Sequence, residues 1–211
     1  MINKAIRSLL VSSALWYLGE SMLGPFFAVF AQKIGGSILD ISGAWTVYLI
    51  VTGILVIIVG KISDTLISKE RLLIAGYFLN CIFTFAYIFI KSPFELFIVQ
   101  AGLGVSAALA TPTWSALFAR HESKKNDGFD WGLAGGSTYL VNAVAVFTGG
   151  IIINYFSFNV LFFTMGVVQV VSAIYVAWKF RAPQKSSVKK VAKHKVKHPH
   201  FAHSLHKRRR I

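Results

Sequence analysis

One acidic residue, Glu20, lies near the middle of an apolar run that extends from about residue 8 to residue 31. An ionised carboxylate at the centre of a membrane span costs on the order of 3 kcal/mol, so such residues usually face the bundle interior and mark binding or proton-transfer sites. Trp16, Glu20 and Gly24 are spaced four residues apart and share one face of a helix. Glu20, with Trp16 beside it, is therefore a candidate for binding a substrate or a proton. The alternative is a protonated carboxyl group bonded to a neighbouring helix.

Other groups that could do chemistry are few. The chain has no nucleophile triad, phosphate-binding glycine loop or zinc-ligand spacing, and its one cysteine, Cys81, lies in an apolar run. We therefore expect no catalytic residue, no cofactor and no metal site, and we expect that the protein is not an enzyme. An intramembrane enzyme would need a second ionisable group beside Glu20, and the apolar runs supply none.

The composition indicates a membrane protein with a separate basic tail. Of the 211 residues 55% are hydrophobic and 14% are charged, and the mean hydropathy is +0.61. Soluble domains carry about 25% charged residues. Twelve of the 22 Lys and Arg residues lie from Lys179 onward, and none of the eight acids does, so the net charge of +14 belongs mainly to the tail. We expect residues 1–180 to form a transmembrane domain, and this charge distribution does not indicate a nucleic-acid-binding domain.

Six apolar runs are long enough to cross a bilayer as helices, which takes about 20 residues. They are apolar at both odd and even positions, unlike the strands of a barrel, so an all-α fold is predicted. The first run is too long for the core of a signal peptide. The expected spans are about residues 8–31, 42–61, 72–91, 94–118, 131–154 and 158–179.

Lysine and arginine alternate between the two ends of these spans. From the N-terminus to the fifth loop the counts are two, one, three, one, three and zero, and the basic tail follows. Because positive charge is enriched in cytoplasmic loops, both termini and the Gly60–Arg71 loop are expected in the cytoplasm. The compact loops suggest a bacterial inner (plasma) membrane.

Residues 181–211 contain Pro183, Pro199, five histidines and no acid. Such a segment buries too little apolar surface to fold alone, so we expect a disordered, polybasic tail. Its lysines and arginines would be attracted to anionic lipid headgroups. Contact with an acidic partner such as ribosomal RNA, or metal binding by the histidines, remains an alternative.

The Gly60–Arg71 loop, GKISDTLISKER, resembles the signature between helices two and three of the major facilitator superfamily, roughly G-x-L-A/S-D-R-x-G-R-K. Thr65 occupies the position of the usual basic residue, and Ile67 that of a glycine. The resemblance implies a cytoplasmic gate latch built on Gly60, Asp64, Lys69 and Arg71, in which Gly60 allows close helix approach. Further similar stretches, over roughly residues 8–180, are Leu23-Gly24-Pro25 and Gly102-Leu103-Gly104 with Pro112-Thr113-Trp114-Ser115.

This resemblance implies the roles of the polar residues in the spans. Helices one and four of the family line a central cavity, which makes Gln100 and Trp114 candidates to join Glu20 and Trp16 there. Asn142 in span five also stays a candidate, because that helix is not one of the peripheral ones. Helices three and six are peripheral, so Asn80 and Gln169 are expected to make interhelical hydrogen bonds. At position 98 an isoleucine replaces the arginine that the family links to proton coupling.

The family normally has twelve helices in two halves, each built from two inverted three-helix repeats. This chain resembles the amino-terminal half. The resemblance implies secondary active transport of a small solute by alternating access, with a homodimer or a second half-transporter as partner. The alternatives are a non-transporting membrane interaction protein and a truncated half that needs a partner.

Overall fold

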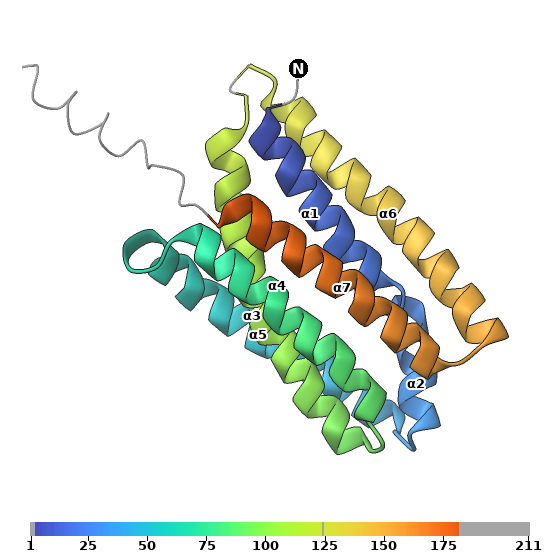
Figure 1. The fold of residues 1–211 in the computed structure, drawn as a ribbon. Helices are drawn as coiled ribbons and strands as arrows, with labels where there is room; N and C mark the ends of the chain where they lie inside the picture. The colour runs from blue at the N-terminus through green and yellow to red at the C-terminus, as the bar shows by residue number, and fades with distance from the viewer. Residues whose placement is uncertain (1–2, 124, 182–211) are drawn as a thin grey trace, which may run out of the picture. The chain divides into compact units, whose positions relative to one another are not determined.

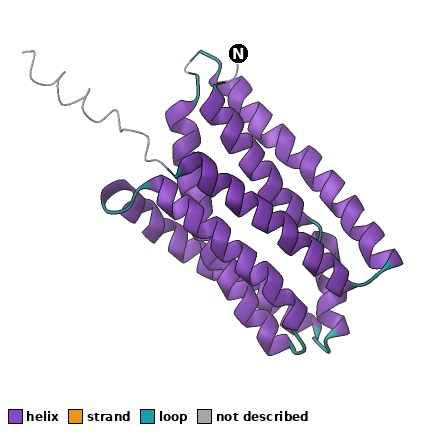
Figure 2. Ribbon diagram, in the orientation of Figure 1, coloured by secondary structure: helices purple, strands orange, loops and turns teal. Residues whose placement is uncertain are grey.

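The computed structural model describes residues 3–123 and 125–181, and in this part of the chain every regular element is a helix (Figures 1 and 2). The predicted disordered tail lies almost entirely outside the described residues. One unit holds Met1–Arg181. Its elements in chain order are α1 (Lys4–Ser21), the short 3₁₀ helix η1 (Gly24–Phe26), α2 (Phe27–Lys33), α3 (Ile38–Thr65), α4 (Lys69–Ala86), the short 3₁₀ helix η2 (Tyr87–Phe89), α5 (Pro93–His121), α6 (Asp127–Tyr155) and α7 (Phe158–Phe180).

These elements make six spans long and apolar enough to cross a membrane, and this confirms the predicted all-α membrane fold. α1, η1 and α2 together form the first span, and α3 to α7, with η2 continuing α4, form the other five. Several helices are longer than predicted, since α3 and α6 extend beyond the apolar run at both ends. Hydropathy marks only the segment that lies in hydrocarbon, whereas the helix continues until a cap or a turn ends it.

The helices pack in a pattern that repeats itself. α1 packs against α6 and α7, α5 packs against α3 and α4, and α4 packs against α7 (Figure 1). If α1, α3 and α4 are exchanged with α5, α6 and α7 in that order, the same pairs of neighbouring helices result. The arrangement is that of two inverted three-helix repeats, with the spans of α1 and α5 in equivalent central positions.

Polar caps start the helices at one end of the bundle. Ser37 begins α3 and Ser92 begins α5, and each forms a capping box with the acid three residues later, Asp40 or Glu95. Reciprocal capping satisfies backbone N–H groups that would otherwise lack partners. Charged caps therefore lie at the ends of the spans, outside the apolar core.

The first span is not continuous, contrary to the single helix predicted over residues 8–31. α1 ends at Ser21 and the chain passes through η1, which contains Pro25, before α2 begins. Proline lacks the N–H that a continuing α-helix needs and favours the first turn of a new helix. The break lies two residues after Glu20, at the end of α1.

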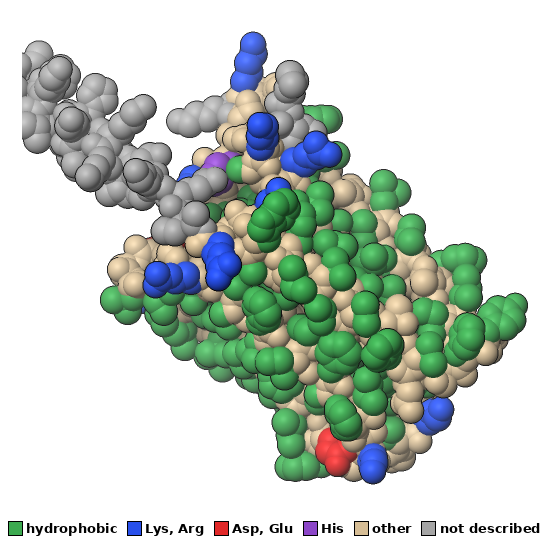
Figure 3. Space-filling view, viewed as in Figure 1, with side chains coloured by type: hydrophobic (Ala, Val, Ile, Leu, Met, Phe, Trp, Pro, Cys, Tyr) green, Lys and Arg blue, Asp and Glu red, His purple; other side chains and the backbone are tan. Residues whose placement is uncertain are grey.

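The surface in Figure 3 is apolar over the middle of the bundle and charged at its ends. Two contacts place the N-terminus, the end of α5 and the α3–α4 connection at one end: Asn3 donates to the carbonyl of His121, and Arg120 pairs with Glu70. At the opposite end Lys33 lies 5.4 Å from the centre of the Phe158 ring. We call these the terminal end and the opposite end.

Candidate functional site

Two of the cavities between the described helices lie toward opposite ends of the bundle. The Glu20 cavity, of about 420 Å³, lies toward the opposite end between α1, α3, α4, α5, α6 and α7. The Trp114 cavity, of about 400 Å³, lies toward the terminal end between α1, α4, α5 and α6. Tyr17 lines both, so the middle of α1 separates them.

Glu20 lies in the wall of the Glu20 cavity and is half-buried. The indole Nε1–H of Trp16 donates a hydrogen bond to its Oε2 atom. This pair has the i, i+4 spacing predicted from the sequence. No described residue donates to Oε1, so one carboxylate oxygen remains available to a ligand or a proton.

Three side-chain amides share this cavity with Glu20. Gln100 is 2% exposed, and Asn142 accepts a hydrogen bond of 2.9 Å from the Ser21 hydroxyl. Asn80 is 1% exposed and neither its nitrogen nor its oxygen has a hydrogen-bond partner among the described residues. The expectation that Asn80 bonds between helices is therefore wrong, because its amide lies in the cavity wall.

Gln169, in contrast, forms the predicted interhelical bond. Its amide nitrogen donates to the Trp16 carbonyl oxygen at 3.0 Å, which ties α7 to α1. Gly19 makes this approach possible, since a Cβ there would lie 2.6 Å from the Gln169 amide nitrogen. The bond fixes the backbone of α1 at the residue that holds Glu20.

Aromatic rings form much of the remaining wall, and the sequence analysis did not identify them. Trp45 and Tyr48 on α3 stack with ring centroids 5.3 Å apart, and Tyr17 and Tyr87 contribute from α1 and η2. Tyrosines within apolar runs were the available signal. Whether Trp45 and Tyr48 point into the cavity depends on how α3 packs against α5, and the hydropathy pattern does not specify that packing.

The candidates Trp16 and Trp114 line the other cavity. The Trp114 indole donates to the Leu9 carbonyl oxygen at 3.1 Å, and Trp16 packs on Tyr77 with centroids 4.7 Å apart. The five candidates therefore divide: Glu20, Gln100 and Asn142 share one cavity, and Trp16 and Trp114 share the second. The hydrogen bond between Trp16 and Glu20 links the two groups.

The segment that resembles a gate loop is mostly helical. α3 continues to Thr65 and α4 begins at Lys69, so the connection is residues 66–68. The predicted Gly60–Arg71 loop is therefore too long at both ends. A Cβ at Gly60 would meet nothing within 4 Å, so the expected close helix approach at Gly60 is wrong within this chain.

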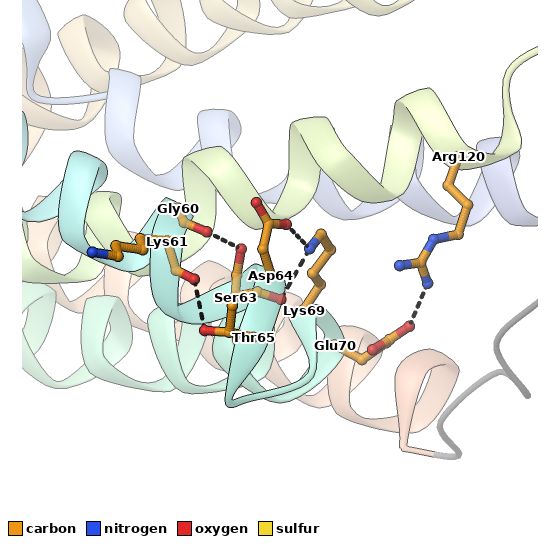
Figure 4. Close-up of polar contacts among 8 residues, drawn as sticks. All are labelled: Gly60, Lys61, Ser63, Asp64, Thr65, Lys69, Glu70 and Arg120. Carbon is orange, nitrogen blue, oxygen red and sulfur yellow. Dashed lines mark hydrogen bonds and ion pairs between the residues drawn. The ribbon is translucent and has the colours of Figure 1, made fainter. Parts of the chain in front are cut away.

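Lys69 and Asp64 nevertheless come together at this connection (Figure 4). The Lys69 ammonium group lies 2.6 Å from Asp64 Oδ1 and donates to the Ser63 carbonyl oxygen at 2.9 Å. A cation is favourable at a helix C-terminus because the last carbonyl groups point toward it. Lys69 thus supplies the positive charge that Thr65 lacks.

A second ion pair joins α4 to α5. Arg120 lies 3.5 Å from Glu70, whose side chain is only 8% exposed (Figure 4). Arg71, the remaining gate candidate, is exposed. The sequence analysis missed Glu70, although it is adjacent to the motif, because the resemblance assigned no role to that position.

Comparison with known proteins gives a consistent result. A family model described as "Major Facilitator Superfamily" matches residues 9–210. The "Uncharacterized MFS-type transporter MJ1560" of Methanocaldococcus jannaschii is 23% identical over 173 residues, which are 82% of this chain and 45% of that protein. The "Uncharacterized MFS-type transporter YitZ" of Bacillus subtilis is 20% identical over 158 residues, which are 75% of this chain and 96% of that protein.

A solved structure shares the fold. The in meso crystal structure of the POT family transporter PepTSo superposes with a TM-score of 0.69 at 13% identity, over 88% of this chain and 40% of that one. The chain thus spans less than half the length of PepTSo and of the archaeal relative, and nearly the whole length of YitZ.

Proposed function

The chain belongs to the Major Facilitator Superfamily, and from this premise we propose that it moves a small solute across the membrane by alternating access, as a six-helix protein. The Glu20 cavity carries this proposal. It places a carboxylate and three amides together within a bundle whose middle is apolar on the surface that Figure 3 shows. Polar groups at that depth are costly unless they serve a ligand, a proton or water.

Glu20 is proposed to bind the substrate or the coupling proton. A closed bundle with Glu20 fully paired to a neighbouring helix would favour the alternative, a membrane interaction protein that moves nothing. Glu20 instead bonds within its own helix and lines a cavity. This geometry favours transport over the interaction role.

The test is proton flux in liposomes that contain the full chain and a trapped pH dye. Solutes are added by class: amines, sugars, amino acids, peptides and carboxylates. We expect at least one class to move protons with the wild type, and we expect that flux to be lost in Glu20→Gln. Flux that is equal in Glu20→Gln and the wild type would remove Glu20 from the mechanism, and the absence of both flux and solute uptake would favour the interaction role.

We propose that the terminal end faces the cytoplasm of a bacterial inner membrane. The alternation of Lys and Arg supports this, because the opposite end carries only Lys33 and Lys91 among the described residues. Cysteines placed at Ser68 and Ser157, after Cys81→Ala, report it directly. In intact cells an impermeant maleimide should label position 157 and not position 68, and the reverse pattern would invert the topology.

The partners are also proposed. A second copy of the chain, or a separately encoded half, would complete twelve helices around the two open cavities. The basic residues from Lys179 onward would hold anionic lipid headgroups. The amount of phosphatidylglycerol that co-purifies with the full chain when it is extracted from mixed-lipid nanodiscs, at low and high salt, tests the lipid contact.

A further inference from the structure

We infer that the Glu20 cavity binds a small organic cation that carries one positive charge and a hydrogen-bonding group. This inference deepens the transport function proposed above by naming the class of its solute. It is based on the charge of the cavity wall, its aromatic rings and its unpaired amide. Each of these observations excludes a different class of ligand.

The charge excludes anions. Glu20 is the one carboxylate among the described residues that line the cavity, and none of them is Lys, Arg or His. An anion would face this carboxylate without a compensating cation, which is unfavourable in an apolar interior. A single positive charge on the ligand would neutralise Glu20, whose Oε1 atom has no donor among the described residues.

The aromatic rings favour an organic cation over a metal ion. Tyr17, Trp45, Tyr48 and Tyr87 line the cavity, and the faces of aromatic rings attract organic cations. Divalent metal ions need several oxygen or nitrogen ligands. No group of three His, Cys, Asp or Glu residues capable of holding a metal occurs in the described part of the chain.

The amides favour a ligand with a polar group. Asn80 is 1% exposed and has no hydrogen-bond partner for either amide atom among the described residues, and Gln100, which lines the same cavity, is 2% exposed. A buried amide without a partner is destabilising, so native structures nearly always supply one. A hydroxyl, carbonyl or amine on the ligand would bond to Asn80 while the cationic group lies at Glu20.

The volume limits the ligand to a small molecule. The cavity measures about 420 Å³, which lies at the lower part of the range of small-molecule sites. The stacked rings of Trp45 and Tyr48 bound it on α3. A compact aryl or alkyl amine fits these limits, whereas a folded peptide does not.

Equilibrium binding to the full chain in nanodiscs tests the inference without any gradient or transport. Radiolabelled tyramine and 3-(4-hydroxyphenyl)propionate, a compact cation and an anion of similar shape that both carry a hydroxyl group, are compared by scintillation. The wild type should bind the cation saturably, and Glu20→Gln should bind it at least about tenfold more weakly. Glu20→Asp keeps the charge and should retain most of the binding, and Glu122→Gln removes an acid at the terminal end and should change nothing.

A second variant tests the aromatic wall independently. Tyr48→Leu keeps the apolar volume and should weaken cation binding by several-fold. Its effect on the anion should be small. A set of aryl amines with and without a hydroxyl group, compared on the wild type and Asn80→Leu, tests the amide, and the hydroxyl should improve binding only in the wild type.

The inference would be overturned if the cation bound equally to the wild type and Glu20→Gln, if the anion bound in a Glu20-dependent manner, or if the wild type bound neither. Size-exclusion profiles and melting curves confirm that each variant is folded. Failure of the transport proposal gives a different result. Cation binding would then depend on Glu20 while no solute crossed the liposome membrane.

Discussion

Among single residues, Lys69 shows how one side chain can replace a missing motif position. Its ammonium group reaches both Asp64 and the Ser63 carbonyl oxygen, and its side chain is 12% exposed, against 72% for Asp64. The ion pair alone is worth little because Asp64 is solvated. The bond to the helix end adds to it, so most of the stabilisation belongs to Lys69.

The first prediction follows from the larger contribution of Lys69 compared with Asp64. Lys69→Met should lower the free energy of unfolding by about 1 kcal/mol, since it removes the ion pair and the helix-end contact together. Asp64→Asn should cost less than half of that, because it removes the ion pair alone. Melting curves in detergent measure both, with Lys61→Met on the exposed surface of α3, the helix of Asp64, as the control. Equal losses of stability in Lys69→Met and Asp64→Asn would contradict the conclusion that the contact of Lys69 with the helix end provides most of the stabilisation.

The buried member of the other ion pair gives the second prediction. Arg120→Ala should destabilise the bundle more than Glu70→Ala does, because it leaves a carboxylate that is only 8% exposed without its partner, whereas the Arg120 side chain is 44% exposed and water can solvate it when Glu70 is removed. The expected difference is about 1 kcal/mol by the same melting assay. A Glu70→Gln variant keeps the volume, so it separates the loss of charge from the loss of packing.

At the level of helices, the break in the first span depends on a glycine in α6. A Cβ built at Gly149 would collide with the backbone of Met22, where α1 has ended and η1 has not yet begun. The glycine therefore lets α6 approach the non-helical backbone closely. This contact keeps the segment after Glu20 in place.

The third prediction compares two glycines of one helix. Gly149→Ala should destabilise the bundle by about 1–3 kcal/mol, because the backbone of Met22 has to move. Gly135→Ala meets nothing within 4 Å and should be neutral or stabilising by up to about 1 kcal/mol, because alanine favours a helix. Thermal melts of the two variants provide the comparison, and a neutral Gly149→Ala would show that the break does not depend on this contact.

These helices also show what could be predicted from the sequence. The lengths of the apolar runs were enough to predict the six spans. The i, i+4 spacing on a helix was enough to predict that Trp16 and Glu20 lie side by side. The break in span one was missed because hydropathy continues through it, although Gly24 and Pro25 were a local signal. The place of Asn80 in the cavity wall was missed because it depends on the rotation of α4 against α5, which periodicity leaves undetermined when both helix faces are apolar.

Over the whole bundle, the central spans are covered and two others are open. In an apolar stretch of 18 residues within the α5 span 56% of the residues are buried. In the corresponding stretches of α3 and α6 only 11% are buried. Three glycines of α6, Gly128, Gly132 and Gly136, are spaced four residues apart, and a Cβ at any of them would meet nothing within 4 Å. Glycine weakens a helix by about 1 kcal/mol relative to alanine, so we expect these three glycines to make a compensating contact outside this bundle.

The fourth prediction concerns that contact. Small residues at this spacing allow two helices to pack closely in lipid, and we expect a second copy of the chain to pack there. The double change Gly132→Leu and Gly136→Leu should then convert a dimer to a monomer in nanodiscs while leaving the melting temperature of the bundle nearly unchanged. Ala75→Leu, on the exposed face of α4, adds the same bulk elsewhere and should leave the dimer intact. Native mass spectrometry gives the masses directly.

A wild type that is monomeric when expressed alone would contradict self-pairing. The open glycines would then be assigned to a different partner, which crosslinking from position 132 in the native membrane would capture.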